Sequence, residues 1–244
     1  MQLKDKVALV TGGAVRIGRA ISLELAEAGC RIACHYNSSR DDALFLKSAV
    51  EKNGGVFHLV KGDLTRSESI LLIVNSVLQK FARIDILINN AAIFFKTPLG
   101  LVKEKDWDLL HTLNLKSAFF LSQEVSRHML KAGSGKIINI GDSAAEVPFP
   151  AYIPYSVTKA GIMALTRGLA KALAPKIQVN CINPGPVMIP DTLTVEEKEF
   201  AINQTLLKSE GSPADIAKTV RFLLEGSDYI TGAIIPVDGG RQIR

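Results

Sequence analysis

The stretch "KVALVTGGAVRIGRAI", residues 6–21, decides the fold. It opens on a short apolar run typical of a buried strand, and the apolar spacing that follows predicts a helix. Between them, the glycine-rich turn "TGGAVRIG" is suited to present backbone N–H groups and a helix N-terminus to a phosphate. The alternative is an ordinary strand-to-helix turn, but its place after the first strand favours a nucleotide site. Arg16 is unexpected in this turn, because glycine would let the backbone approach a ligand more closely.

Strand and helix patterns alternate along the whole chain. Strands are predicted at residues 6–10, 31–36, 55–63, 83–92, 135–143, 177–185 and 232–240. Helices are predicted at residues 16–29, 40–54, 67–82, 104–131, 155–174 and 213–226. Several strands are almost entirely apolar, as in a parallel sheet that helices cover on both faces. The sequence therefore predicts an α/β fold, a single Rossmann-like domain over residues 1–244 with a doubly wound parallel sheet. Ligands of such sheets bind beyond the carboxyl ends of the strands.

The composition excludes several classes of protein. The 29 basic and 24 acidic residues give a net charge of +5 without a block of like charges, so nucleic acid is not an expected partner. No apolar run approaches the roughly 20 residues of a membrane span, and "MQLKDK" is unlike a secretory signal. Cys30, Cys34 and Cys181 form no C-x-x-C pair and indicate a reducing compartment. We expect a cytoplasmic protein that acts on a small molecule and has no metal site.

The end of the second predicted strand, "HYNSSR" at residues 35–40, bears on the choice of cofactor. Enzymes that select NAD place a carboxylate there, whereas those that select NADP use cations and hydroxyls. The first acid is Asp41, and it is preceded by Asn37, Ser38, Ser39 and Arg40. This favours NADP(H), although a polar loop that caps the next helix is the alternative. Asp63, at the end of the third strand, is expected either to accept from the adenine amino group or to be a helix N-cap.

A tyrosine and a lysine in "YSVTK" point to proton transfer. Tyr155 and Lys159 are four residues apart and therefore share one helical face. A nearby ammonium favours the phenolate, so we expect it to lower the pKa of Tyr155 from its ordinary value near 10. The alternative is two unrelated surface residues. The preceding strand "GKIINIGDS" and the glycine-rich turn at the start of the chain favour a catalytic pair.

These motifs together resemble those of the short-chain dehydrogenase/reductase family. The resemblance covers essentially the whole chain, and it rests on "TGGAVRIG", Asp63, "NNAA" at 89–92, Asn114 in "LNLKSAFF", "YSVTK", "NPGP" at 183–186 and "ITGAIIPVDGG". It implies about seven strands, a nicotinamide cofactor, hydride transfer and a homotetramer. It makes Tyr155 the proton donor, has Lys159 hold the nicotinamide ribose, and has Asn114 help hold a relay water. The implied cofactor-binding residues are Gly12, Arg16, Ile17, Tyr36, Asn37, Ser38, Ser39, Arg40, Asp63, Leu64, Asn89, Ala91, Tyr155, Lys159, Pro184 and Gly185.

Two residues depart from the family's common pattern. Most members carry glycine where this chain has Arg16, and most carry a serine thirteen residues before the catalytic tyrosine. That position is Asp142 here, with Ser143 one residue later. A serine suits a ketone oxygen, whereas an aspartate suits the ring N–H and amino groups of a nitrogen heterocycle. We therefore count Asp142 among the candidate catalytic residues.

Both departures occur in the pteridine reductase branch, which this sequence resembles. That branch has an aromatic residue after the Asn-Asn-Ala turn, against which a pterin stacks, and counting along the turn assigns it to Phe94. Core packing of Phe94 is the alternative. Asn37 and Ser38 stand where a histidine and an arginine are usual in the branch, and Ala92 replaces a common serine.

The sequence thus predicts an NADPH-dependent reductase of a pterin-like heterocycle. Its substrate-binding residues would be Arg16, Phe94, Asp142 and Tyr155, and residues 187–207 would cover the substrate. The first alternative is a carbonyl reductase of the same family acting on a 3-oxoacyl chain, a sugar or a ketone, with Ser143 as the oxygen ligand. A nucleotide-binding regulator without catalysis is a second alternative, against which Asn114, Tyr155 and Lys159 argue.

Overall fold

One parallel sheet of seven strands forms the centre of the computed structural model, which describes residues 1–189 and 193–244. The strands are β1 (Val7–Val10), β2 (Arg31–Tyr36), β3 (Phe57–Lys61), β4 (Ile86–Asn89), β5 (Gly135–Ile140), β6 (Ile177–Pro184) and β7 (Ile234–Val237). Their order in the sheet is β3-β2-β1-β4-β5-β6-β7, and every neighbouring pair is parallel. From β1 the chain adds β2 and β3 on one side and β4 to β7 on the other, so the strand order reverses between β1 and β4. Ligands of doubly wound folds bind at this point. The predicted fold class is confirmed.

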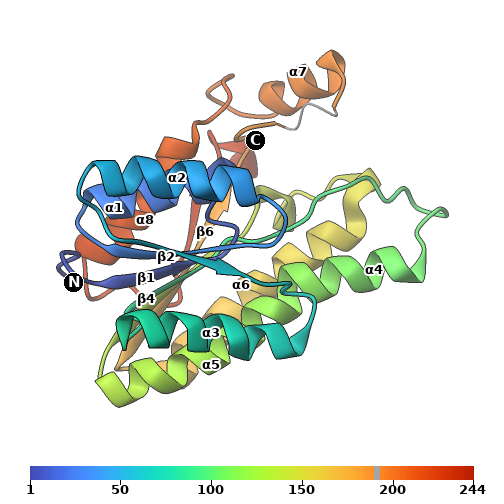
Figure 1. Ribbon diagram of the computed structural model, residues 1–244. Helices are drawn as coiled ribbons and strands as arrows, with labels where there is room; N and C mark the ends of the chain where they lie inside the picture. The colour runs from blue at the N-terminus through green and yellow to red at the C-terminus, as the bar shows by residue number, and fades with distance from the viewer. Residues whose placement is uncertain (190–192) are drawn as a thin grey trace.

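Helices cover both faces of this sheet (Figure 1). One face carries α1 (Arg16–Glu27), α2 (Arg40–Lys52) and α8 (Pro213–Glu225). The other face carries α3 (Ser67–Phe81), α5 (Ser117–Ala132) and α6 (Ile153–Leu173), with α4 (Glu104–His111) extending beyond the sheet. Two buried apolar clusters lie between the sheet and these layers. All residues of β1, β4 and β5 are buried, as their apolar sequences predict.

The helix predicted over 104–131 is interrupted in the middle. After α4, residues Thr112–Lys116 form a π-helical segment, η1, before α5 begins at Ser117. Such single-turn π segments are frequent at functional sites. Here the segment contains Asn114, which is buried.

The segment after β6 rises above the carboxyl edge of the sheet (Figure 1). It contains α7 (Val195–Asn203), which Thr194 and Glu197 cap reciprocally. The salt bridge from Lys96 to Glu197, 2.5 Å long, joins α7 to the loop after β4. The segment at 187–207 that the sequence predicts to cover the substrate includes α7, and its residues 190–192 lie outside the described residues.

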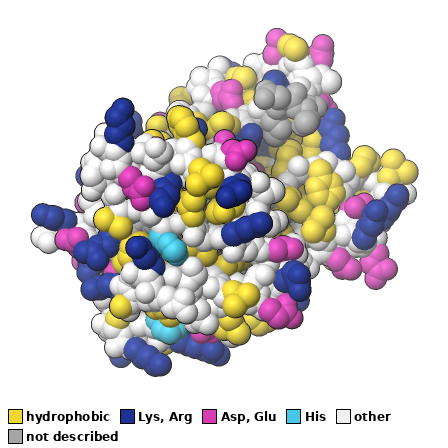
Figure 2. All heavy atoms as spheres, viewed as in Figure 1, with side chains coloured by type: hydrophobic (Ala, Val, Ile, Leu, Met, Phe, Trp, Pro, Cys, Tyr) yellow, Lys and Arg dark blue, Asp and Glu magenta, His cyan; other side chains and the backbone are white. Residues whose placement is uncertain are grey.

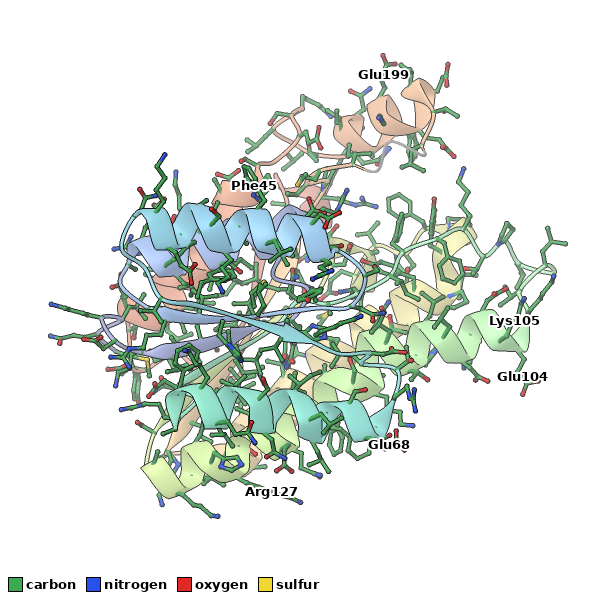
Figure 3. The ribbon with its side chains drawn as sticks, viewed as in Figure 1. Phe45, Glu68, Glu104, Lys105, Arg127 and Glu199 are labelled. Atoms are coloured by element: carbon green, nitrogen blue, oxygen red, sulfur yellow. The ribbon has the colours of Figure 1, made fainter. Side chains whose placement is uncertain are left out.

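The surface shows charges of both signs. Basic and acidic side chains are interspersed over the visible face of the molecule (Figure 2). Glu68, Glu104, Lys105 and Arg127 point outward from α3, α4 and α5 (Figure 3). Within the described ranges, no helix is long and apolar enough to cross a membrane.

Candidate active site

A cavity of about 700 Å³ lies at the carboxyl ends of the strands. It brings together most of the residues singled out in the sequence, although they come from loops far apart in the chain. The predicted residues on its wall are Gly12, Arg16, Ile17, Tyr36, Asn37, Ser38, Ser39, Asp63, Leu64, Ala91, Phe94, Asp142, Tyr155, Lys159, Pro184 and Gly185. Three others, Arg40, Asn89 and Asn114, are not among its lining residues.

The glycine-rich turn packs tightly under the start of α1. Gly12 has a φ of +58°, and a side chain there would press on Ala91. A Cβ at Gly18 would collide with the carbonyl oxygen of Gly12. The turn therefore depends on glycine at both positions, and it leaves the N-terminal end of α1 facing the cavity.

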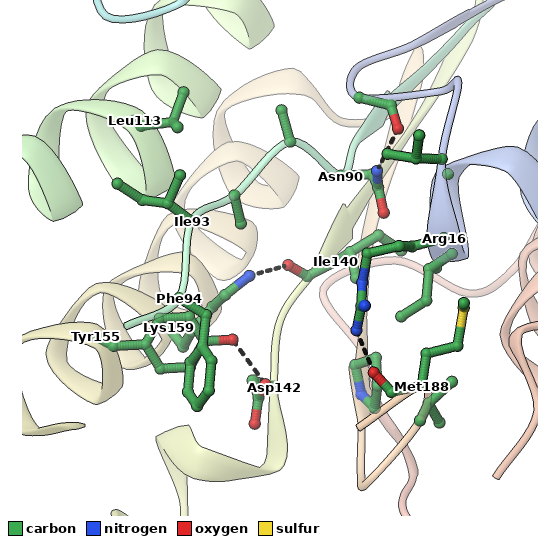
Figure 4. Close-up of a pocket in the computed structure, with 18 of the residues that line it drawn as sticks. Arg16, Asn90, Ile93, Phe94, Leu113, Ile140, Asp142, Tyr155, Lys159 and Met188 are labelled. Atoms are coloured by element: carbon green, nitrogen blue, oxygen red, sulfur yellow. Dashed lines mark hydrogen bonds between the residues drawn. The ribbon is translucent and has the colours of Figure 1, made fainter. Parts of the chain in front are cut away.

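Arg16 is the first residue of α1 and has a φ of +51°, in the left-handed region that favours glycine. Glycine would adopt this conformation without the steric cost that a side chain carries. The Arg16 guanidinium donates to the carbonyl oxygen of Met188, in the segment after β6 (Figure 4). Arg16 thus connects the glycine-rich turn with the segment that follows β6.

Thr11 and Asn90 hold this turn against the loop after β4, a role that the sequence patterns did not reveal. The Thr11 hydroxyl accepts from the backbone N–H groups of Asn90 and Ala91 at 2.9 and 3.0 Å. The Asn90 side chain donates to the carbonyl oxygens of Thr11 and Gly12 at 2.9 and 3.2 Å. The two loops on either side of the strand-order reversal therefore form one unit.

His35, at the end of β2, is a second site residue that sequence reasoning missed. Its Nδ1 accepts from the backbone N–H of Gly12 at 3.3 Å, and its Nε2 lies 3.1 Å from the carbonyl oxygen of Gly62. These two partners require a neutral ring with the proton on Nε2. Burial lowers the pKa of His35 to about 4. His35 therefore ties the turn at Gly12 to the end of β3 without carrying charge.

Polar side chains follow β2 and β3 at the far end of the cavity. Asn37, Ser38 and Ser39 line it, and Ser39 precedes α2 without making a side-chain capping hydrogen bond. Asp63 also lines the cavity, and its Oδ1 accepts from the backbone and hydroxyl of Thr65. The expectation that Asp63 caps a helix is wrong, because Arg66 occupies the N-cap of α3. The hydrogen bonds from Thr65 lower the pKa of Asp63.

At the other end of the cavity, the hydroxyl of Tyr155 donates to Oδ2 of Asp142 at 2.7 Å (Figure 4). The other carboxylate oxygen accepts from the backbone N–H of Ala144, also at 2.7 Å. Asp142, thirteen residues before Tyr155 in the sequence, therefore lies directly beside the tyrosine hydroxyl. Ser143 lines the cavity too, and its buried hydroxyl has no hydrogen-bond partner among the described residues.

The expected effect of Lys159 on Tyr155 is not seen. The pKa of Tyr155 is raised well above its ordinary value, first by burial and then by the charge of Asp142 and the hydrogen bond to it. The Lys159 ammonium lies 5.7 Å from the centre of the Tyr155 ring and donates to the carbonyl oxygen of Ile140 at 2.9 Å. Burial lowers the pKa of Lys159 itself. The prediction of a lowered tyrosine pKa is therefore corrected: the carboxylate and the loss of water outweigh the ammonium.

Two predicted asparagines lie behind the cavity wall. The Asn114 side chain bonds both backbone groups of Ile93, accepting at 2.9 Å and donating at 3.0 Å. It therefore positions the loop that carries Phe94. The Asn89 side chain donates to Ser122 and Asn139 at 2.9 and 2.8 Å, so its amide serves the interior of the sheet.

Phe94 is partly committed to packing. One face of its ring stacks on Tyr152, with centroids 4.3 Å apart and planes 6° apart. The rings of Phe94 and Tyr155 meet edge to face, with centroids 4.8 Å apart. The ring nevertheless lines the cavity and is 38% exposed, so a surface remains for a ligand. Arg16 lies across the pocket from Phe94 and Tyr155 (Figure 4).

Phe149 and Arg241 complete this end of the wall, and neither was predicted from the sequence. The Arg241 guanidinium lies 4.1 Å from the centre of the Phe149 ring. Arg241 follows the "DGG" motif, but no local pattern in the sequence indicates that its side chain turns into the site.

Comparison with known proteins identifies the family. The model of the enoyl-(acyl carrier protein) reductase family matches residues 13–242. The 3-oxoacyl-[acyl-carrier-protein] reductase of Staphylococcus epidermidis is 35% identical over 240 residues, which are 97% of this chain and 98% of that protein. A solved short-chain dehydrogenase/reductase from Serratia marcescens is 35% identical with a TM-score of 0.93, covering 99% of this chain and 100% of that one. The chain belongs to the short-chain dehydrogenase/reductase family.

Membership of the short-chain dehydrogenase/reductase family makes the chain an oxidoreductase with the predicted sheet. A further solved member is FolM alternative dihydrofolate reductase 1 from Brucella canis, in complex with NADP. It is 30% identical with a TM-score of 0.93, covering 100% of this chain and 96% of that one. Similar proteins are thus named as a 3-oxoacyl-[acyl-carrier-protein] reductase and as an alternative dihydrofolate reductase.

Proposed function

We propose that this protein is an NADPH-dependent reductase of a pterin-like heterocycle. The observation that carries the proposal is the hydrogen bond from Tyr155 to Asp142, with Phe94 beside the pair. A carboxylate at this position accepts from the N–H and amino groups of a pteridine ring, whereas it repels the lone pairs of a ketone oxygen. The Brucella protein named as a dihydrofolate reductase, similar over 96% of its chain, supports the same substrate class.

The cavity fits a nicotinamide dinucleotide. Tight glycine packing at Gly12 and Gly18 leaves the start of α1 open to a pyrophosphate. Asn37, Ser38 and Ser39 would meet the extra phosphate of NADP, with Arg40 following at the start of α2. Asp63 and Leu64 would border the adenine, while Ala91, Lys159, Pro184 and Gly185 would hold the nicotinamide end. When bound, the reduced cofactor supplies the hydride.

The side chains at the other end of the cavity supply the proton. The Tyr155 phenol has a raised pKa, so it is protonated near neutral pH, as a proton donor must be. As the substrate carbon accepts the hydride, Tyr155 gives its proton to the ring nitrogen. The Lys159 ammonium then stands beside the phenolate until that group recovers a proton. Asn114 acts through the loop that it holds at Ile93, and its part in a water relay is a further proposal.

A 3-oxoacyl reductase is the second candidate. The 35% identity with the Staphylococcus enzyme over 240 residues favours it. The Ser143 hydroxyl favours it as well, because Ser143 lines the cavity and its hydroxyl has no hydrogen-bond partner among the described residues. In that reaction Ser143 would donate to the ketone oxygen. The shared cofactor and Tyr155 do not separate the two candidates.

The deciding experiment follows NADPH consumption with a dihydropterin, dihydrofolate and an acetoacetyl thioester. We expect the wild-type protein to turn over the dihydropterin. The Asp142→Ser variant should lose this activity and gain reduction of the acetoacetyl thioester. Ser143→Ala is the matched control, and it should leave pterin turnover within about twofold of the wild type. Turnover of the thioester alone, abolished in Ser143→Ala, would establish the second candidate instead.

The predicted homotetramer belongs to the same proposal. Apolar side chains that are exposed on a single chain lie on α4 and α5, among them Trp107, Leu109, Phe119 and Phe120. Their burial between subunits would account for them. Light scattering at micromolar concentration gives the mass of the assembly directly.

A further inference from the structure

Arg241 is a buried residue of the cavity wall, and no ion pair to its guanidinium is seen among residues 1–189 and 193–244. Arg241 is 5% exposed, and its Nε has no hydrogen-bond partner among the described residues. Its guanidinium carbon lies 4.1 Å from the centre of the Phe149 ring. A buried charge is costly unless it is paired, so such a group calls for an explanation.

Asp238 and Asp142 are the two carboxylates whose charges act on Arg241, and both accept hydrogen bonds from other groups. Asp238 accepts from the backbone N–H groups of Gly240 and Gln242, each at 2.9 Å. Asp142 accepts from Ala144 and Tyr155. Burial lowers the pKa of Arg241, and the charges of Asp142 and Asp238 oppose that shift only in part. No ion pair within 4.0 Å joins Arg241 to either carboxylate in the described part of the chain.

The contact with Phe149 uses none of the hydrogen-bond donors of Arg241. A guanidinium that lies over an aromatic ring uses its flat face, and its five N–H donors point outward in the plane. Arg241, Phe149 and Asp142 line the same cavity as Tyr155. One wall of the site thus presents fixed donors near a fixed carboxylate acceptor.

We propose that Arg241 is a substrate-binding residue that donates to an acceptor atom on the edge of the substrate ring, while Asp142 accepts from an N–H or amino group of that ring. This inference rests on the proposed function and narrows it to planar rings that carry a carbonyl acceptor beside a nitrogen donor. An amino-oxo pteridine has both groups. In a diaminopteridine the oxo acceptor is replaced by an amino donor, which Arg241 cannot bind.

The test compares binding of these two ligands by calorimetry, using the protein saturated with NADP. In Arg241→Met we expect roughly tenfold to hundredfold weaker binding of the amino-oxo pteridine, the loss of a hydrogen bond from a charged donor. The diaminopteridine should change by less than about threefold, because it never used that donor. Arg241→Lys keeps the charge but not the planar guanidinium, so its affinity for the amino-oxo pteridine should lie between those of the wild type and Arg241→Met. Arg244→Met, an exposed arginine of the same turn, is the matched control and should change neither affinity.

Thermal unfolding without ligand separates binding from a structural role. Replacing an unpaired buried charge by an apolar side chain of similar length should leave the melting temperature unchanged or raise it. A purely structural arginine would instead lower it and weaken both ligands and NADP alike. If Arg241→Met does not fold, the comparison of the two ligands in Arg241→Lys decides whether Arg241 binds the substrate.

The outcomes distinguish this inference from the proposed function. Wild-type protein that reduces dihydropterin, with Arg241→Met binding the amino-oxo ring as tightly as wild type, would overturn the role of Arg241 alone. Equal losses for both ligands would do the same. Wild-type protein that binds neither pteridine would overturn both proposals.

Discussion

The Tyr155 hydroxyl donates a 2.7 Å hydrogen bond to Oδ2 of Asp142, across thirteen residues of sequence. Each residue changes what the other can do. The carboxylate keeps the phenol protonated, and the phenol keeps one carboxylate oxygen oriented toward the cavity. In the proposed reaction, a substrate that reaches Tyr155 would also meet Asp142, so the proton donor and the substrate-orienting group would act as a pair.

Removing the charge of this pair should move the pH profile in a defined direction. Burial and Asp142 raise the pKa of Tyr155, and a phenol is active as a donor below its pKa. In Asp142→Asn the charge is gone, so the alkaline limb of kcat/KM for dihydropterin should move to lower pH. We expect kcat to fall on the order of a hundredfold as well. An alkaline limb that stays in place would show that Asp142 does not control Tyr155.

Arg16→Gly should separate backbone strain from ligand binding. Glycine adopts the φ of +51° at this position without penalty, which should raise the free energy of unfolding by about 1 kcal/mol. The lost contact with Met188 offsets part of this gain, so the melting temperature should stay unchanged or rise. The lost guanidinium should weaken NADPH binding about tenfold and slow pterin turnover with it. Arg16→Lys, which keeps both the strain and the charge, is the control. A change confined to NADPH affinity would remove Arg16 from the substrate site.

Phe94→Leu should weaken pterin binding more than it affects a carbonyl substrate. The exposed surface of the Phe94 ring is the candidate stacking platform, and a lost ring contact is worth roughly tenfold in KM. Phe95→Leu is the matched control, because Phe95 packs nearby but is not among the lining residues of the cavity. Equal effects in the two variants would indicate core packing instead of substrate binding.

The buried His35 should make the fold sensitive to acid. Its pKa is about 4 in the folded protein, below the ordinary 6.5, so the unfolded chain binds the proton first as pH falls. The stability that depends on neutral His35 is therefore complete above about pH 6.5 and is lost progressively toward pH 4, by roughly 3 kcal/mol. Urea unfolding of wild type and His35→Gln at about pH 7 and pH 5 measures this contribution. A loss on acidification that is just as large in His35→Gln would assign it to other groups.

Much of the molecule is determined by local sequence patterns. Apolar runs and helical spacing predicted the seven strands and the doubly wound sheet, because burial on both faces leaves a mark in every strand. The spacing of Tyr155 and Lys159 placed both on one helix for the same local reason. The count of thirteen residues back to Asp142 rested on resemblance to a family, and the structure shows the hydrogen bond that joins the two ends.

Only the tertiary structure decided the electrostatics and the remaining walls of the site. The pKa of Tyr155 is raised because burial and Asp142 outweigh Lys159, and burial depends on every element packed around the phenol. His35 and Arg241 enter the site through contacts with Gly12 and Phe149, far away in sequence. Periodicity records which face of an element is buried, but it does not record which distant group a side chain meets.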